Sequence, residues 1–69
     1  MIVTKHYDKD ILGKLFKTQI GYHYKIYKQI EGKYKAISQS YVYLHSRIEC
    51  EQRMMKEIEY FTEITTINN

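Results

Sequence analysis

The 69-residue chain contains no proline, no tryptophan, three glycines and one cysteine. The lone Cys50 excludes a disulfide within the chain, and an unpaired thiol is typical of a reducing compartment. Gly13, Gly21 and Gly32 stand apart in the sequence, which excludes a glycine-rich phosphate loop. Because chain-breaking residues are scarce, we expect mostly regular structure with short connections.

No apolar run approaches the roughly 18 residues of a membrane span, and the N-terminus has no secretory signal pattern. We therefore expect a soluble, cytoplasmic protein that does not associate with a membrane. The chain begins with Met1 and contains no linker-like stretch. This is expected of a complete gene product folded as a single domain over residues 1–69.

What the chain does contain is enough apolar and aromatic material for a core. Hydrophobic residues make up 43% of it, and the 14% aromatic fraction consists of eight Tyr and two Phe, which argues against global disorder. Net charge is +3, but eight Lys precede residue 47 and five Glu follow it. A basic front and an acidic back are most often solvated surfaces.

The clearest element is a C-terminal helix of about 16–18 residues that begins at a capping box formed by Ser46 and Glu49. Its last five residues, 65–69, are poor helix formers and are expected to fray. At about 100° per residue, seven apolar side chains fall within one arc that would face the core. They are Ile48, Cys50, Met54, Met55, Ile58, Phe61 and Ile64.

The middle of the chain predicts a hairpin of residues 22–29 and 34–38, joined by a three-residue loop that ends in a left-handed Gly32. This loop pairs Gln29 with Lys33 and separates apolar from charged side chains. The inner face would carry Tyr22, Tyr24, Ile26, Tyr34 and Ala36. The outer face would carry His23, Lys25, Tyr27, Gln29, Lys33, Lys35 and Ile37.

Residues 41–44 predict a third strand, with Val42 and Leu44 facing inward. Residues 2–4 suit a short strand, and Asp8 or Asp10 is placed to cap a short helix with one apolar side. That side would consist of Ile11, Leu12, Leu15 and Phe16. The expected fold class is α+β: a three-stranded antiparallel meander, a long C-terminal helix packed on one face and a short N-terminal helical segment.

The sequence offers no catalytic, cofactor or metal site. Cys50 shares an apolar arc with Met54 and is flanked by two Glu, so we expect it to be a core residue. His6, His23 and His45 show no zinc-ligand spacing with one another or with Cys50. We therefore expect a protein that is not an enzyme and takes no cofactor.

A partner-binding surface is the strongest functional expectation, because Tyr supplies contact area and Lys attracts acidic partners. The predicted surface consists of His23, Lys25, Tyr27, Gln29, Lys33, Lys35, Tyr41 and Tyr43.

In its size, Lys-, Ile- and Tyr-rich composition and meander-then-helix order over residues 22–61, the chain resembles short accessory proteins of phages and mobile elements, including anti-CRISPR-like inhibitors. The resemblance implies stoichiometric binding to a host protein or ribonucleoprotein complex, as an inhibitor or adaptor. An acidic helix surface that mimics phosphate charge is then the second candidate. It comprises Glu51, Glu57, Glu59 and Glu63.

The alternative is direct nucleic-acid binding by the basic, Tyr-bearing outer face of the sheet. Three strands followed by a helix, over residues 24–58, also resemble the arm-binding domain of some integrases. The chain departs from that pattern in having two Arg against nine Lys, whereas bidentate Arg is the commonest specific reader of bases. With either function, Tyr41 and Tyr43 on an edge strand would also allow a homodimer.

Overall fold

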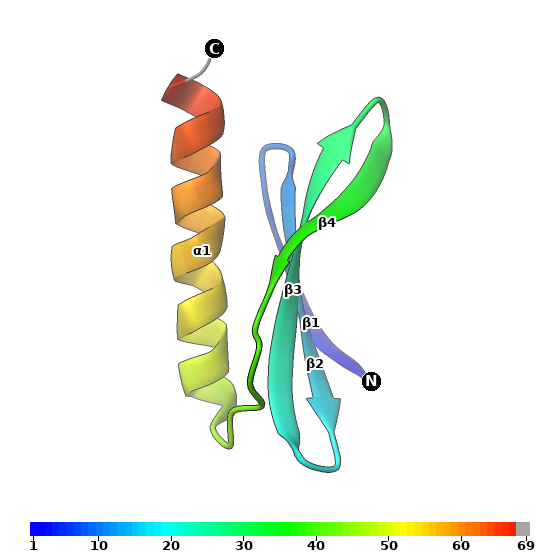
Figure 1. Ribbon diagram of the computed structural model, residues 1–69, viewed down its shortest axis with the longest axis vertical. Helices are drawn as coiled ribbons and strands as arrows, with labels where there is room; N and C mark the ends of the chain where they lie inside the picture. The colour runs from blue at the N-terminus through cyan, green and yellow to red at the C-terminus, as the bar shows by residue number, and fades with distance from the viewer. Residues whose placement is uncertain (68–69) are drawn as a thin grey trace.

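The computed structural model describes residues 1–67, which form a four-stranded antiparallel sheet with one helix against a single face (Figure 1). The strands lie side by side in the order of the chain, as a meander. The elements are β1 (Ile2–Asp8), β2 (Ile11–Thr18), β3 (Gly21–Ile30), β4 (Lys33–Gln39) and α1 (Arg47–Ile67). The α+β class and the C-terminal helix are as expected from the sequence, whereas the number of strands is not.

The predicted N-terminal helical segment is wrong, because residues 11–18 form β2, a central strand of the sheet. Ile11 and Leu15 face the helix and are fully buried, while Leu12 and Phe16 alternate with them on the opposite face. Neither Asp8 nor Asp10 caps a helix there. The carbonyl of Asp10 accepts the amide N–H of Gln29 at 2.8 Å, next to the turn between β1 and β2.

The predicted hairpin register is also wrong, because β3 and β4 are joined by two residues rather than three. Ile30 pairs with Lys33, and the turn residues Glu31 and Gly32 have φ angles of 53° and 80°. Two successive left-handed residues are what a tight hairpin turn requires. The change moves the β4 side chains between the turn and residue 36 to the other face of the sheet, while those of β3 stay on the predicted faces.

A β-bulge in β4 then shifts the register by one more residue, so that side chains beyond the bulge return to their predicted faces. Ile26 pairs with Ser38 while its neighbour Tyr27 pairs with Ala36, which leaves Ile37 as the extra residue. A bulge bends its strand, and the tip of the β3–β4 hairpin curves away from α1 (Figure 1). The helix therefore does not cover the turn end of the β3–β4 hairpin (Figure 1).

The predicted third strand over residues 41–44 is absent from the described part of the chain, except for one bridge. Leu44 exchanges two backbone hydrogen bonds of 2.7 and 2.8 Å with Tyr22. Leu44 packs against the core as expected, but Val42 is 57% exposed. These residues form a connecting segment that runs along the edge of β3 to the start of α1.

The core lies between α1 and the helix-facing side of the sheet. Met54 and Ile58, four residues apart on one line of the helix, pack with Cys50 against sheet residues. Ile48 and Met55, which were expected in the core, are 69% and 40% exposed. Gly13 in β2 explains the close approach of the helix, because a Cβ built there would lie 2.5 Å from the Cδ1 atom of Ile58.

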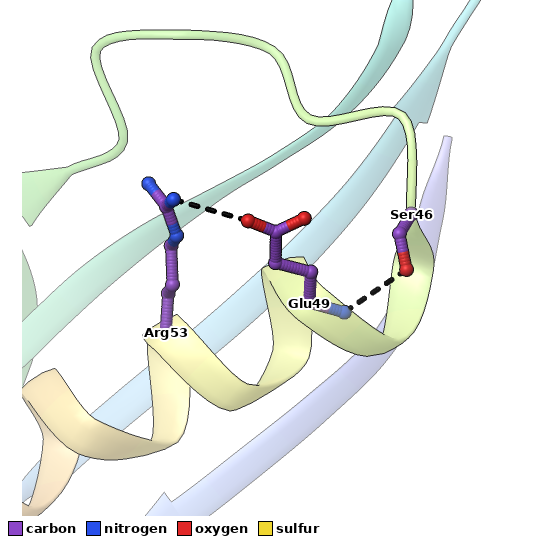
Figure 2. Close-up of polar contacts among 3 residues, drawn as sticks. All are labelled: Ser46, Glu49 and Arg53. Carbon is purple, nitrogen blue, oxygen red and sulfur yellow. Dashed lines mark hydrogen bonds and ion pairs between the residues drawn. The ribbon is translucent and has the colours of Figure 1, made fainter.

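The helix begins as the sequence predicts. The Ser46 hydroxyl accepts the amide N–H of Glu49 at 3.2 Å (Figure 2), which satisfies one of the free donors of the first turn. The Glu49 carboxylate accepts a hydrogen bond from Arg53 at 3.0 Å (Figure 2), whereas a full capping box would have it accept the backbone N–H of Ser46. Helix α1 continues to Ile67, so residues 65–67 are helical and not frayed, while residues 68–69 lie outside the described part. No helix in residues 1–67 has the length and apolar character to cross a membrane.

Candidate nucleic-acid interface

The side of the sheet that α1 leaves uncovered is called the outer face here. Strand alternation and the observed registers place a mixed set of basic, aromatic and small side chains on it. Its members are Lys5, Tyr7, Leu12, Lys14, Phe16, His23, Lys25, Tyr27, Gln29, Tyr34, Ala36 and Gln39.

Three lysines form a row across the outer face. Lys5 in β1 pairs with Lys14 in β2, and Lys14 pairs with Lys25 in β3. Like charges directly opposite each other on neighbouring strands destabilise a sheet. The row therefore opposes folding slightly in the free protein, and an anion bound along it would remove that repulsion.

Aromatic rings lie on both sides of this lysine row. On one side, Tyr7 and Tyr27 flank Leu12, which is only 3% exposed although α1 lies on the other face. On the other side, Phe16 and His23 stack with ring centroids 4.9 Å apart. The uncovered face thus has partly packed rings beside three mobile cations.

Two of the cations lie over these rings. The Lys14 Nζ atom is 4.8 Å from the centroid of Tyr27, and the Lys25 Nζ atom is 5.9 Å from that of Phe16. Such cation–π contacts place the ammonium groups over the faces of the rings and pair them with no carboxylate.

Among residues 1–67, none of the carboxylates lies on the outer face. Five of the eight acidic residues are on α1, and Asp8 is paired with Ile11 on the helix-facing side. The other two, Asp10 and Glu31, are in turns. No neighbouring acid screens the row, so the potential above the middle of the sheet is positive.

Only part of the predicted surface comes together. Four members, His23, Lys25, Tyr27 and Gln29, share the outer face, and Tyr43 joins them through an edge-on contact with His23 at 5.2 Å. Tyr41 is 90% exposed on the connecting segment.

Lys33 and Lys35 do not belong to this surface. They pair with Ile30 and Lys28 on the opposite side of the sheet, because the two-residue turn shifts the register by one. Tyr34 and Ala36, predicted on the inner face, take their place on the outer face.

The sequence interpretation missed Lys5, Lys14, Tyr7 and Phe16 as members of the outer face, because the predicted first strand ended at residue 4 and β2 was expected to be helical. A signal for them was present. Lys5 and Tyr7 alternate along β1, and Leu12, Lys14 and Phe16 alternate along β2. Period-two alternation is the pattern of a strand.

The second predicted surface, the acidic helix, is divided by the structure. Glu51 contacts Nε2 of His6 in β1 at 3.0 Å, and Glu57 accepts a hydrogen bond of 2.6 Å from the hydroxyl of Ser38 in β4. Burial raises the pKa of Glu57 above its usual value. Glu59 and Glu63 are exposed, and Glu59 lies beside β1, where it lines a pocket with His6 and Asp8. Glu57 faces β4 instead, so the four carboxylates do not share one face.

His23 gives the outer face a dependence on pH. Burial lowers its pKa below the usual 6.5, and the positive charges of Lys25 and the N-terminal amine lower it further. The unfolded chain therefore binds the proton more readily than the folded one. Stability conferred by neutral His23 is present above pH 6.5 and decreases as the pH falls through and below that value.

We expect His23→Gln to remove part of the pH dependence of stability. Urea unfolding of the natural chain should show a smaller free energy of unfolding just below pH 6.5 than above it. The difference between the chain and the variant isolates His23 from other titrating groups. If the difference in free energy of unfolding between the two proteins does not change with pH, or if the natural chain gains stability relative to the variant as the pH falls, the lowered pKa of His23 is contradicted.

Other kinds of site find little support among the described residues. Cys50 is fully buried in the core, as predicted. Within residues 1–67, no three His, Cys, Asp or Glu side chains are grouped so as to hold a metal ion. Comparison of the chain with family models, curated proteins and solved structures gave no match.

Proposed function

We propose that this chain is a non-enzymatic protein that binds single-stranded nucleic acid through the outer face. One observation carries the proposal: Lys5, Lys14 and Lys25 are aligned across three strands between two groups of aromatic rings, on a face without carboxylates. Phosphates would neutralise the lysines, and unpaired bases would stack on the rings.

A single strand fits this face better than a duplex does. Bases in a duplex are stacked on one another and cannot reach a flat aromatic surface, whereas those of a single strand can. Both arginines, Arg47 and Arg53, are on α1, so the outer face lacks the side chain that most often reads bases in the major groove.

Inhibition of a host protein or ribonucleoprotein complex remains a prediction from the sequence. The division of the acidic helix surface leaves a phosphate mimic with less support than the lysine row has. An acidic protein is a competing occupant of the lysine row, and it is distinguished by experiment.

The test is fluorescence anisotropy with short single-stranded oligonucleotides, the matching duplex and a poly-glutamate peptide, over a series of salt concentrations. We expect the single strand to bind most tightly. Three phosphate contacts predict a slope of about −2 in a plot of log affinity against log salt. Preference for the duplex or for poly-glutamate, or affinity independent of salt, would refute the proposal.

A further inference from the structure

A pocket of about 350 Å³ lies where the lysine row reaches the edge of β3. Lys25 is the last lysine of the row, and it lines this pocket together with its cross-strand partner Gln39. The full lining is His23, Lys25, Gln39, Ser40, Tyr41 and Tyr43.

The connecting segment that forms the outer wall of the pocket is held in place by backbone hydrogen bonds. The amide N–H of Ser40 donates to the carbonyl of Tyr24 at 3.0 Å, and the Ser40 hydroxyl accepts the amide N–H of Tyr24 at 3.1 Å. Further along, Leu44 and Tyr22 exchange two more hydrogen bonds. Tyr41 and Tyr43 therefore project from a segment anchored at both ends, which reduces the entropy lost when a ligand binds.

The groups that line the pocket suit one nucleotide. Tyr43 is 46% exposed and contacts the ring of His23 edge-on, which leaves aromatic surface for a base. The amide of Gln39 both donates and accepts hydrogen bonds, as the edge of a base requires. Lys25 supplies a cation for the adjoining phosphate, and no carboxylate lines the pocket.

We infer that this pocket binds one base of the strand, with Gln39 contacting the edge of the base and Tyr43 its face. The inference rests on the proposed function for the path of the strand, since the lysine row leads into the pocket. It adds a source of base preference, which an electrostatic row alone does not provide.

The pocket is tested without any strand by titrating the four nucleoside 5′-monophosphates into isotope-labelled protein and recording backbone amide shifts. We expect saturable shifts at Gln39, Ser40 and Tyr41, with different affinities for the four bases. The control is inorganic phosphate, which should shift the lysines of the row, Lys5, Lys14 and Lys25, and leave Gln39 and Tyr41 unshifted. Equal shifts with phosphate and with all four nucleotides would overturn the base pocket.

Variants provide the second test, with homopolymeric single strands as probes. Gln39→Ala combined with Tyr43→Ala should weaken the preferred homopolymer about tenfold and reduce the differences between homopolymers. Gln39→Ala alone should reduce the differences as well, and because Gln39 is exposed this variant should fold as the natural chain does. Gln52→Ala combined with Tyr60→Ala is the matched control, because it removes the same residue types from exposed positions on α1, away from the outer face.

The two proposals fail in different ways. If strands bind but the Gln39 and Tyr43 variants and the control behave alike, the base pocket is wrong and the proposed function stands. If strands do not bind while nucleotides still shift Gln39 and Ser40, the pocket stands and the proposed function is wrong.

Discussion

Replacing Lys5, Lys14 and Lys25 together by Gln is expected to weaken single-strand binding about 100-fold at low salt. Each lysine contributes about 1 kcal/mol at an exposed phosphate contact, and three such losses give a factor of this size. The slope of log affinity against log salt should become shallower by about 2, because three fewer phosphates are neutralised and each accounts for about 0.7 of the slope on a single strand. Fluorescence anisotropy over a salt series measures both quantities.

The matched control is Lys33, Lys35 and Lys56 replaced by Gln. It changes net charge by the same amount, but these lysines lie on the opposite side of the sheet and on α1. We expect its affinity to stay within about threefold of the natural chain, since distant surface charges are screened by salt. Equal losses in both triple variants would show a general attraction for polyanions and no defined site.

The lysine variant should also be slightly more stable than the natural chain. Lys14 has a like charge on each side, so removing the row relieves two unfavourable cross-strand pairs. Relief of a few tenths of a kcal/mol per pair is expected. A gain in stability together with a loss of binding is the usual sign of a functional position. A loss of both in urea unfolding would mean that the lysines have a structural role.

Ile26→Ala is expected to destabilise the fold by about 2–5 kcal/mol. Ile26 is fully buried in the centre of β3, opposite Gly13, so no neighbouring side chain on β2 can fill the space that it would leave. A chain of this length has a total stability of roughly 3–10 kcal/mol. Urea unfolding monitored by circular dichroism should therefore show a large fall in the midpoint, or an unfolded population without denaturant.

Ile37→Ala provides the control for this prediction. It makes the same chemical change in the neighbouring strand, at the extra residue of the bulge, where the side chain is 38% exposed. We expect a loss below about 1 kcal/mol. Similar losses at the two positions would mean that the helix does not pack over β3 as described.

The C-terminal half of the fold could be predicted from the sequence because its signals are local. A Ser followed three residues later by Glu marks the helix start, and Met54 and Ile58 recur at helical spacing. The width of the buried stripe could not be predicted in the same way. It depends on where the helix lies on the sheet, which buries Cys50, Met54 and Ile58 and leaves Ile48 and Met55 exposed.

The N-terminal half was predicted wrongly as helical because β2 carries apolar residues on both of its faces. The pairs Ile11 with Leu12 and Leu15 with Phe16 match the spacing of a helix as well as that of a two-sided strand. Only the neighbouring strands decide between the two, and they lie elsewhere in the chain. The consequence for function was large, since two of the three lysines in the row are in β1 and β2.

The hairpin register could not be fixed from the chain alone because two irregularities compensate each other. A non-glycine residue, Glu31, adopts a left-handed conformation to close the two-residue turn, and the bulge at Ile37 restores the pairing beyond it. Together they place Ser38 opposite Ile26, as the expected alternation requires, and leave Tyr34 and Ala36 on the outer face with Lys33 and Lys35 on the other side. The segregated pattern that suggested a longer loop is therefore not realised between the turn and the bulge.

The meander order has a consequence for how the chain folds during synthesis. Each strand pairs with the one made just before it, so contacts within the sheet are short in sequence and form quickly. The apolar side of the sheet nevertheless stays open until Met54 and Ile58 have left the ribosome. A nascent chain that stalls before α1 would expose Ile11, Leu15 and Ile26 together, the kind of surface that molecular chaperones bind.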